Sequence, residues 1–169
     1  MKLLVTKRGA PWRAQLACGG RVYPCALGRG GVHAAKHEGD GRTPAGEFRL
    51  RYALYRADRM PRPKTRLPVK AIRLFDGWCD APAHPAYNRL VRLPIRASAE
   101  PLRLSRPMYD LIIVIGYNDA PPVPGKGSAI FLHVAAANFA PTAGCIALKR
   151  PHLLALLAQL DASSRIVIG

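Results

Sequence analysis

The 169-residue sequence has no apolar run long enough to cross a bilayer. A membrane-spanning helix needs about 20 consecutive, mostly apolar residues, whereas the longest run here, 111–115, has the length of a strand. The first residues, MKLLVTKRG, also hold fewer apolar residues than the roughly 7–15 that form the core of a secretory signal. The sequence therefore predicts no transmembrane segment, and no export signal is visible in it.

Acidic residues are scarce, with 10 Asp and Glu against 26 Lys and Arg, for a formal net charge of +16. A field of this size attracts polyanions such as nucleic acid, acidic lipid or an acidic cell-wall polymer. The basic residues of segment 49–73 stand singly among apolar ones and form neither a basic arm nor a basic helix. Two interpretations stay open: a solvated basic surface, or a track for a polyanion.

Aromatic residues are also few, at 7%, and they do not alternate with basic residues along any one segment. The sequence shows no helix-turn-helix pattern, no zinc-finger spacing and no paired aromatic strand motif. A basic nucleic-acid-binding module therefore remains a rival hypothesis supported by charge alone, and no nucleic-acid partner is expected.

No two of the four cysteines form a Cys-x-x-Cys pair, which argues against a zinc ribbon. Cys18 and Cys25 can face each other across a hairpin. Free thiols are expected if the protein stays in a reducing compartment, and one disulfide can form if it is exported. His33 and His37 share a loop that offers too few further ligands for a metal. We therefore expect neither a metal nor a cofactor.

Short alternating segments dominate what is present. Segments 12–18 and 21–27 flank Gly19-Gly20, a strong hairpin signal. Segment 151–160 opens with proline and repeats leucine at helical spacing, which predicts one amphipathic helix. Further strands are expected at 3–5, 47–55, 72–75, 108–115, 129–134, 144–148 and 165–168, with loops at 28–46, 76–94 and 116–127. About nine strands and one substantial helix predict a mostly β single domain over residues 1–169, a twisted sandwich or partly open barrel.

His133 and Cys145 are the candidate catalytic pair, at the end of one predicted strand and the start of the next. A cysteine becomes a nucleophile when an imidazole, backbone amides or local positive charge favours its thiolate. Gly144 lets the backbone turn sharply, so the amides of Ala143, Gly144 and Cys145 can converge on a developing oxyanion. The alternatives are a structural cysteine in an apolar strand, and His33, His37, His84 or His152 as the base.

Two motifs carry a resemblance to a known family. His133 followed by Pro-Thr-Ala-Gly-Cys-Ile-Ala-Leu (141–148) resembles the His…Ser/Thr-His-Gly-Cys signature of YkuD-type L,D-transpeptidases. Gly-Asp-Gly-Arg-Thr-Pro-Ala-Gly-Glu-Phe (39–48) is similar to the family's Gly-x-x-x-Thr-Pro-x-Gly-x-Phe segment. Ala143 stands where many members have a second histidine, and Ala147 where many have arginine, so the sequence looks like a divergent branch.

The resemblance implies a peptidoglycan L,D-transpeptidase, an acyltransferase that crosslinks stem peptides or exchanges D-amino acids on them through a thioester on Cys145. The resemblance also implies that its partners are donor and acceptor stem peptides and that it works in the cell envelope or periplasm. It further implies that carbapenems inhibit it by modifying Cys145. The alternatives are an L,D-carboxypeptidase or endopeptidase at the same site, and a cytoplasmic location. A monomer is expected.

The remaining site residues are predictions of supporting roles. Thr142 is expected to shape the turn before the nucleophile. The walls of the substrate groove are expected to come from loop residues, namely Trp78, Tyr87, Tyr117, Asn118 and Lys126. If His133 stabilises the thiolate, Cys145 should react with thiol reagents well below the usual thiol pKa of about 8.5.

Overall fold

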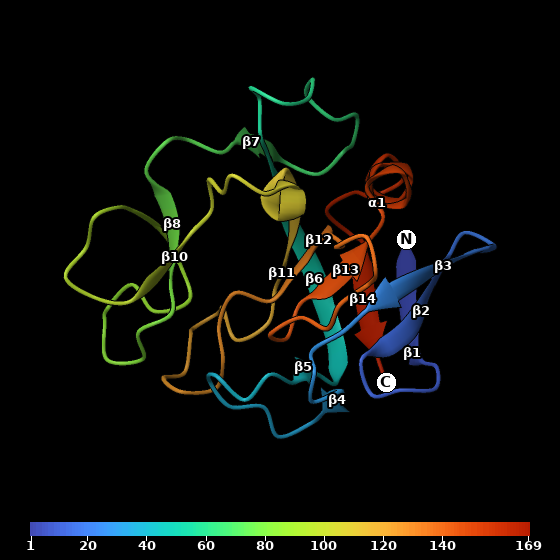
Figure 1. Cartoon of the computed structure of the whole chain (residues 1–169), viewed down its shortest axis with the longest axis horizontal. Helices are drawn as coiled ribbons and strands as arrows, with labels where there is room; N and C mark the ends of the chain where they lie inside the picture. The colour runs from blue at the N-terminus through green and yellow to red at the C-terminus, as the bar shows by residue number, and fades with distance from the viewer.

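A closed ring of strands forms the body of the protein in the computed structural model, which describes all of residues 1–169 (Figure 1). Because β11 also pairs with β6, the main sheet closes on itself and has no free edge there. The mostly β, single-domain prediction is confirmed, as a closed barrel. Around the ring run β11 (Leu111–Ile115), β12 (Phe131–Val134), β13 (Ile146–Leu148), β3 (Arg21–Ala26), β2 (Arg13–Cys18), β1 (Lys2–Lys7), β14 (Arg165–Ile168) and β6 (Gly46–Tyr55), with β7 (Val69–Ala71) beside β6.

The apolar run of β11 is buried on both of its faces. Leu111, Ile113 and Ile115 point into the main core inside the barrel. Ile112 and Val114 point outward into a second, smaller apolar cluster. Side chains alternate along a strand, so only a strand covered on both faces reads as an unbroken apolar run.

A small three-stranded sheet covers this outer face, with β8 (Asp76–Cys79) between β10 (Ala99–Pro101) and β9 (Leu90–Arg92). It stands at the left of the barrel in Figure 1. The predicted strand at 72–75 is wrong: this stretch is a turn in which the Asp76 carboxylate accepts the Arg73 N–H at 2.9 Å and Leu74 and Phe75 are exposed. Segment 76–94, expected to be irregular, supplies two of the three strands.

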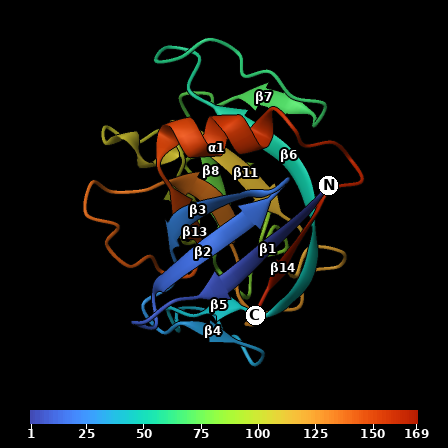
Figure 2. The same cartoon turned by 90° about the vertical axis from the view of Figure 1, so that its right-hand side faces the viewer.

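Helix α1 (Arg150–Leu157) lies across one end of the barrel (Figure 2). It buries Leu153, Leu156 and Leu157 in the main core, as its leucine spacing predicts, although it ends three residues earlier than expected. The predicted strand 108–115 begins only at Leu111, after the short 3-10 helix η1 (Pro107–Tyr109). Within loop 28–46, β4 (Val32–His33) pairs with β5 (Thr43–Pro44). No helix is both long and apolar enough to traverse a bilayer.

Candidate active site

The register of two parallel strands brings His133 and Cys145 to one face of the sheet. Leu132 pairs with Ile146 and His133 with Ala147. Leu132 and Ile146 point into the barrel, so their chain neighbours His133 and Cys145 point outward, toward the small sheet. Strand spacing and rise then put the two Cα atoms on the order of 8 Å apart on neighbouring strands.

Both side chains line one cavity of about 710 Å³ between the barrel and its loops. The turn before the nucleophile, Pro141–Cys145, supplies one wall. Charged groups of both signs supply much of the rest: Arg29, Lys36, Arg106, Glu38, Asp80 and Glu100.

The thiol of Cys145 is buried, with 7% of the residue exposed. Its Sγ donates to the carbonyl oxygen of Ala129 at 3.1 Å and accepts the Phe131 N–H at 3.4 Å. Burial raises the pKa of this thiol to about 12; Glu100 adds to the rise, and Phe131 N–H and Lys36 oppose it. The expectation of a thiolate near neutral pH is therefore wrong, because the small sheet and loops remove the water that would solvate the anion.

The imidazole of His133 is also uncharged at neutral pH. Burial lowers its pKa to about 4, although a hydrogen bond to the carbonyl oxygen of Val134 raises the pKa in part. Nδ1 lies 3.0 Å from that oxygen. A carbonyl oxygen only accepts, so Nδ1 carries the hydrogen and Nε2 keeps its lone pair. The ring is therefore held in the tautomer of a general base.

The turn that precedes Cys145 is held by Thr142. Its hydroxyl donates to the Cys145 carbonyl oxygen at 2.7 Å and accepts the Gly144 N–H at 3.1 Å. Of the three amides expected to converge on an oxyanion, that of Gly144 is therefore already used, whereas the N–H groups of Ala143 and Cys145 have no acceptor. Gly144 has φ +147°, and a Cβ there would lie 2.8 Å from the carbonyl oxygen of Arg42.

Two carboxylates, Glu100 of β10 and Asp80 after β8, line the same cavity as the pair, together with Tyr109 of η1. The Tyr109 hydroxyl donates to Glu100 Oε1 at 2.6 Å, and the Tyr109 ring meets the His133 ring edge-on at 5.5 Å between centroids. Burial raises the pKa of Glu100, and the neighbouring Asp80 carboxylate raises it further. Asp80 Oδ1 is buried without a hydrogen-bond partner.

The five loop residues predicted to bind substrate do not line this cavity. Each has a contact or position elsewhere. Trp78 is buried and donates from Nε1 to Asn88 at 2.9 Å; the Tyr87 hydroxyl donates to the Glu38 carboxylate. The Tyr117 hydroxyl donates to the carbonyl oxygen of Lys126, Asn118 bonds to backbone of its own loop, and the Lys126 side chain is exposed.

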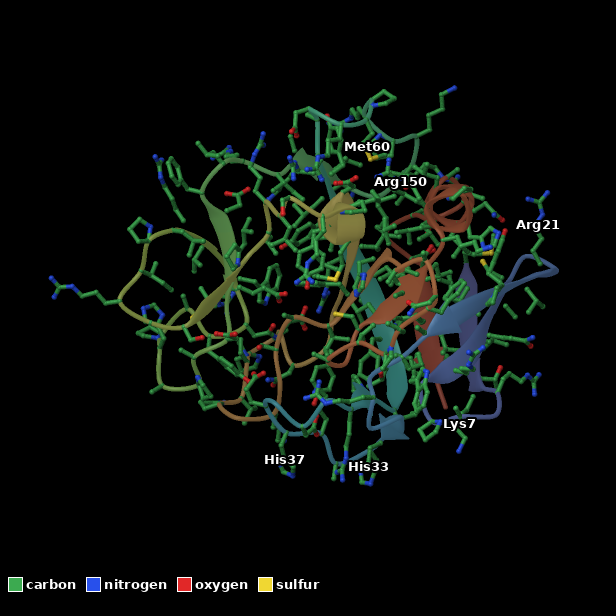
Figure 3. All side chains as sticks on the ribbon, in the orientation of Figure 1. Lys7, Arg21, His33, His37, Met60 and Arg150 are labelled. Carbon is green, nitrogen blue, oxygen red and sulfur yellow. The ribbon has the colours of Figure 1, made fainter.

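The four rival bases lie apart from Cys145, since none of them lines the cavity. His33 and His37 point outward from the loop at the bottom of the view (Figure 3). His152 packs against Tyr23, 5.0 Å between ring centroids, and His84 accepts the Ala86 N–H. No three His, Cys, Asp or Glu side chains gather in a group that could hold a metal ion.

Two buried polar residues at the site escaped the sequence analysis. Asn88 ties the small sheet to Ala129, the residue whose carbonyl oxygen receives the Cys145 thiol. Lys36 has a side chain only 3% exposed and pairs with Asp40 at 2.9 Å. Both stand in loops rich in polar residues, and no periodic pattern marks either for burial.

Residues 17–168 match the family YkuD, the L,D-transpeptidase catalytic domain. The chain belongs to this family. Its members are cysteine-dependent L,D-transpeptidases that act on peptidoglycan peptides and are typically associated with the cell envelope. None of the curated proteins and none of the solved structures compared with the chain matches it.

Proposed function

We propose that this YkuD protein is a peptidoglycan L,D-transpeptidase in which Cys145 is the nucleophile and His133 the general base. The observation that carries the proposal is the shared face of β12 and β13. There, a thiol and an imidazole with a free Nε2 lone pair line the same cavity. Both groups are neutral at rest, so the proton moves only when a carbonyl is in place to be attacked.

The first half-reaction forms a thioester. His133 Nε2 takes the thiol proton while Cys145 Sγ attacks the carbonyl carbon of the donor stem peptide, which gives a tetrahedral oxyanion. The free N–H groups of Cys145 and Ala143 are the candidate donors to that oxygen, and such a donor typically contributes about 3–4 kcal/mol. The intermediate collapses when the leaving amine departs with the proton from His133.

The second half-reaction transfers the acyl group. An amine of the acceptor stem attacks the thioester carbonyl carbon and loses a proton to His133. The C–S bond then breaks, and the sulfur recovers its proton from the imidazole.

The charges around the cavity suit a stem peptide, which carries both carboxylates and an amine. Arg29, Lys36 and Arg106 bring positive charge to the cavity lining, and Glu38, Asp80 and Glu100 bring negative charge. A substrate with charges of both signs can be matched by these groups. The net charge of +16 attracts the anionic polymer as a whole.

The test is incubation of the purified protein with defined disaccharide-tetrapeptide muropeptides, with and without an acceptor stem. Mass spectrometry should find an acyl adduct on Cys145 and, with acceptor present, crosslinked dimers. Cys145→Ala should give neither product, and His133→Gln should slow adduct formation by about 10²–10⁴-fold, the usual contribution of a general base. Cys18→Ala is the matched control, since this buried thiol lies in the barrel core.

The outcomes separate the reaction types. Dimers formed by Cys145→Ala would overturn the assignment of the nucleophile. Shortened monomers with no dimers at any acceptor concentration would replace the transferase with a hydrolase, in which water resolves the same thioester.

A further inference from the structure

Lys36 is a buried cation at the wall of the catalytic cavity. Lysine is almost never fully buried unless it is paired, yet only 3% of this side chain is exposed. Nζ donates to Asp40 Oδ1 at 2.9 Å and to the carbonyl oxygen of His37 at 3.3 Å. An ammonium has three N–H donors, so one remains without a partner. The next side chain, His37, points out of the molecule (Figure 3).

Two glycines lie against the Lys36 side chain. A Cβ on Gly127 would lie 2.8 Å from Lys36 Cε, so a larger residue there would displace the end of the lysine side chain. A Cβ on Gly144 would lie 3.5 Å from Lys36 Nζ. The ammonium group is thus directed at the residue that precedes the nucleophile.

The cation also acts on the sulfur electrostatically, since it lowers the pKa of the Cys145 thiol while burial raises it. Residues 143 and 147, two positions before and after the cysteine, are alanines and carry no charge, so Lys36 supplies from another loop a charge that these positions do not. Asp40 stays ionised beside it. Burial opposes that ionisation, but hydrogen bonds from His37 N–H, Lys36 and Arg42 N–H lower the Asp40 pKa to about 2.

We propose that Lys36 is a further catalytic residue, whose free N–H bonds the oxygen of the attacked carbonyl as that oxygen becomes negative. It would complete the oxyanion site that the Cys145 and Ala143 amides begin, and it would supply the charge that those amides lack. Asp40 holds the ammonium in place and limits the cost of burying it. The inference rests on the function proposed above, and it assigns to loop 28–46 a part in the chemistry.

The test compares Lys36→Met and Lys36→Gln with wild type in single-turnover acylation of Cys145 and in steady-state dimer formation. Loss of a charged oxyanion donor should lower kcat by about 10²–10³-fold with KM within about threefold. Lys36→Gln keeps a neutral donor, so its loss should be smaller. Lys7→Met is the matched control, since it removes the same charge from the exposed end of β1 (Figure 3) and should keep wild-type kcat.

A second measurement needs no substrate. Iodoacetamide alkylation of Cys145 at pH 9, read by peptide mapping, should be on the order of tenfold slower in Lys36→Met, because the cation that favours the thiolate is gone. Asp40→Asn removes the carboxylate that holds the ammonium in place, so it should lower both the stability and kcat, with a kcat loss no larger than that of Lys36→Met.

Two results would overturn the inference: unchanged kcat and alkylation in Lys36→Met, or a raised KM with kcat intact. The second would make Lys36 a binder of a substrate carboxylate. If Lys36→Met does not fold by circular dichroism, Lys36→Gln decides by the same criteria. Failure of the proposed function itself is distinguishable, because it appears as catalysis that survives Cys145→Ala.

Discussion

The thiol of Cys145 donates its hydrogen to the carbonyl oxygen of Ala129, 3.1 Å away. The resting sulfur is therefore a satisfied, neutral group, and in the proposed mechanism it has to leave this contact before it can pass its proton to His133. Substrate binding is the event that can trigger the change, because a carbonyl carbon in the cavity offers the sulfur a new partner.

Alkylation of Cys145 should follow a high thiol pKa. With a pKa near 12, the iodoacetamide rate should rise about tenfold per pH unit between pH 7 and 10, with no plateau near neutrality. Peptide mapping after timed labelling measures this, and Cys145→Ser identifies the peptide. A plateau below pH 8 would contradict the buried, neutral thiol.

The buried imidazole should make stability depend on pH. The folded pKa of His133, about 4, lies below the unfolded value of about 6.5, so the unfolded chain binds the extra proton between these pH values. Stability should fall as pH drops through that window, by about 3 kcal/mol in all. Urea unfolding of wild type and His133→Gln at several pH values measures the effect as a difference.

The difference is needed because Glu100 acts in the opposite direction. Its folded pKa is raised, so its contribution is complete below the unfolded value of about 4.5 and is lost as pH rises through the folded pKa. Glu100 is present in both proteins and cancels. Parallel stability curves for wild type and His133→Gln would show that the imidazole is not buried uncharged.

Substitution of Gly144 should damage both stability and catalysis. A Cβ there would meet the Arg42 carbonyl oxygen at 2.8 Å and would adopt φ +147°. We expect Gly144→Ala to lose about 2–4 kcal/mol and most acylation activity, because the turn that carries Cys145 must shift. Gly9→Ala is the control: it has φ +70° with nothing within 4 Å, so it should cost about 1–2 kcal/mol and keep the activity.

Asn88 should be essential to the join between the small sheet and the barrel. Only 5% of this residue is exposed. Its Oδ1 accepts Trp78 Nε1–H at 2.9 Å and Ala129 N–H at 3.0 Å. Its Nδ2 donates to the carbonyl oxygens of Tyr117 and Asn118. Asn88→Ala leaves these groups unpaired, which should cost about 3 kcal/mol or more.

Because Ala129 also receives the Cys145 thiol, Asn88→Ala should lower activity as well as the unfolding midpoint in urea. Asn138→Ala is the control, since this exposed side chain accepts a single N–H, from Ala140, and its loss should change little. Wild-type stability in Asn88→Ala would show that the small sheet is held by its apolar contacts alone.

Elements with a clear period were predictable from the sequence, and elements made by distant pairing were not. The hairpin at 13–26 and helix α1 follow from alternation, Gly19-Gly20 and leucine spacing. Strands β8, β9 and β10 have three or four residues each, too few to show a period, and they exist because the segments pair with one another. The apolar residues Leu74 and Phe75 therefore predicted a strand although they are exposed, and the observed strand, β8, begins just after them.

The candidate pair followed from motif and strand position, whereas its electrostatics did not. His133 and Cys145 were chosen because each adjoins a strand, and the parallel register of β12 and β13 accounts for their shared face. The sign of the thiol pKa shift depends on what covers Cys145, and that cover comes from loops far along the chain. For the same reason the burial of Lys36 was not predicted: a lysine in a glycine-rich loop is ordinarily solvated, whereas this one lies against Gly127 of a distant loop and pairs with Asp40.

Strand β14 pairs in parallel with β1 on one side and antiparallel with β6 on the other. The barrel therefore joins residues 2–5 to residues 165–168 through a strand that a ribosome makes after all the others of the ring. Until residue 168 has left the exit tunnel, β1 and β6 each present an unpaired edge, and the seam between them stays open. These edges are open to edge-to-edge association until β14 is made, and β12 and β13, which carry the candidate pair, are made before the barrel can close.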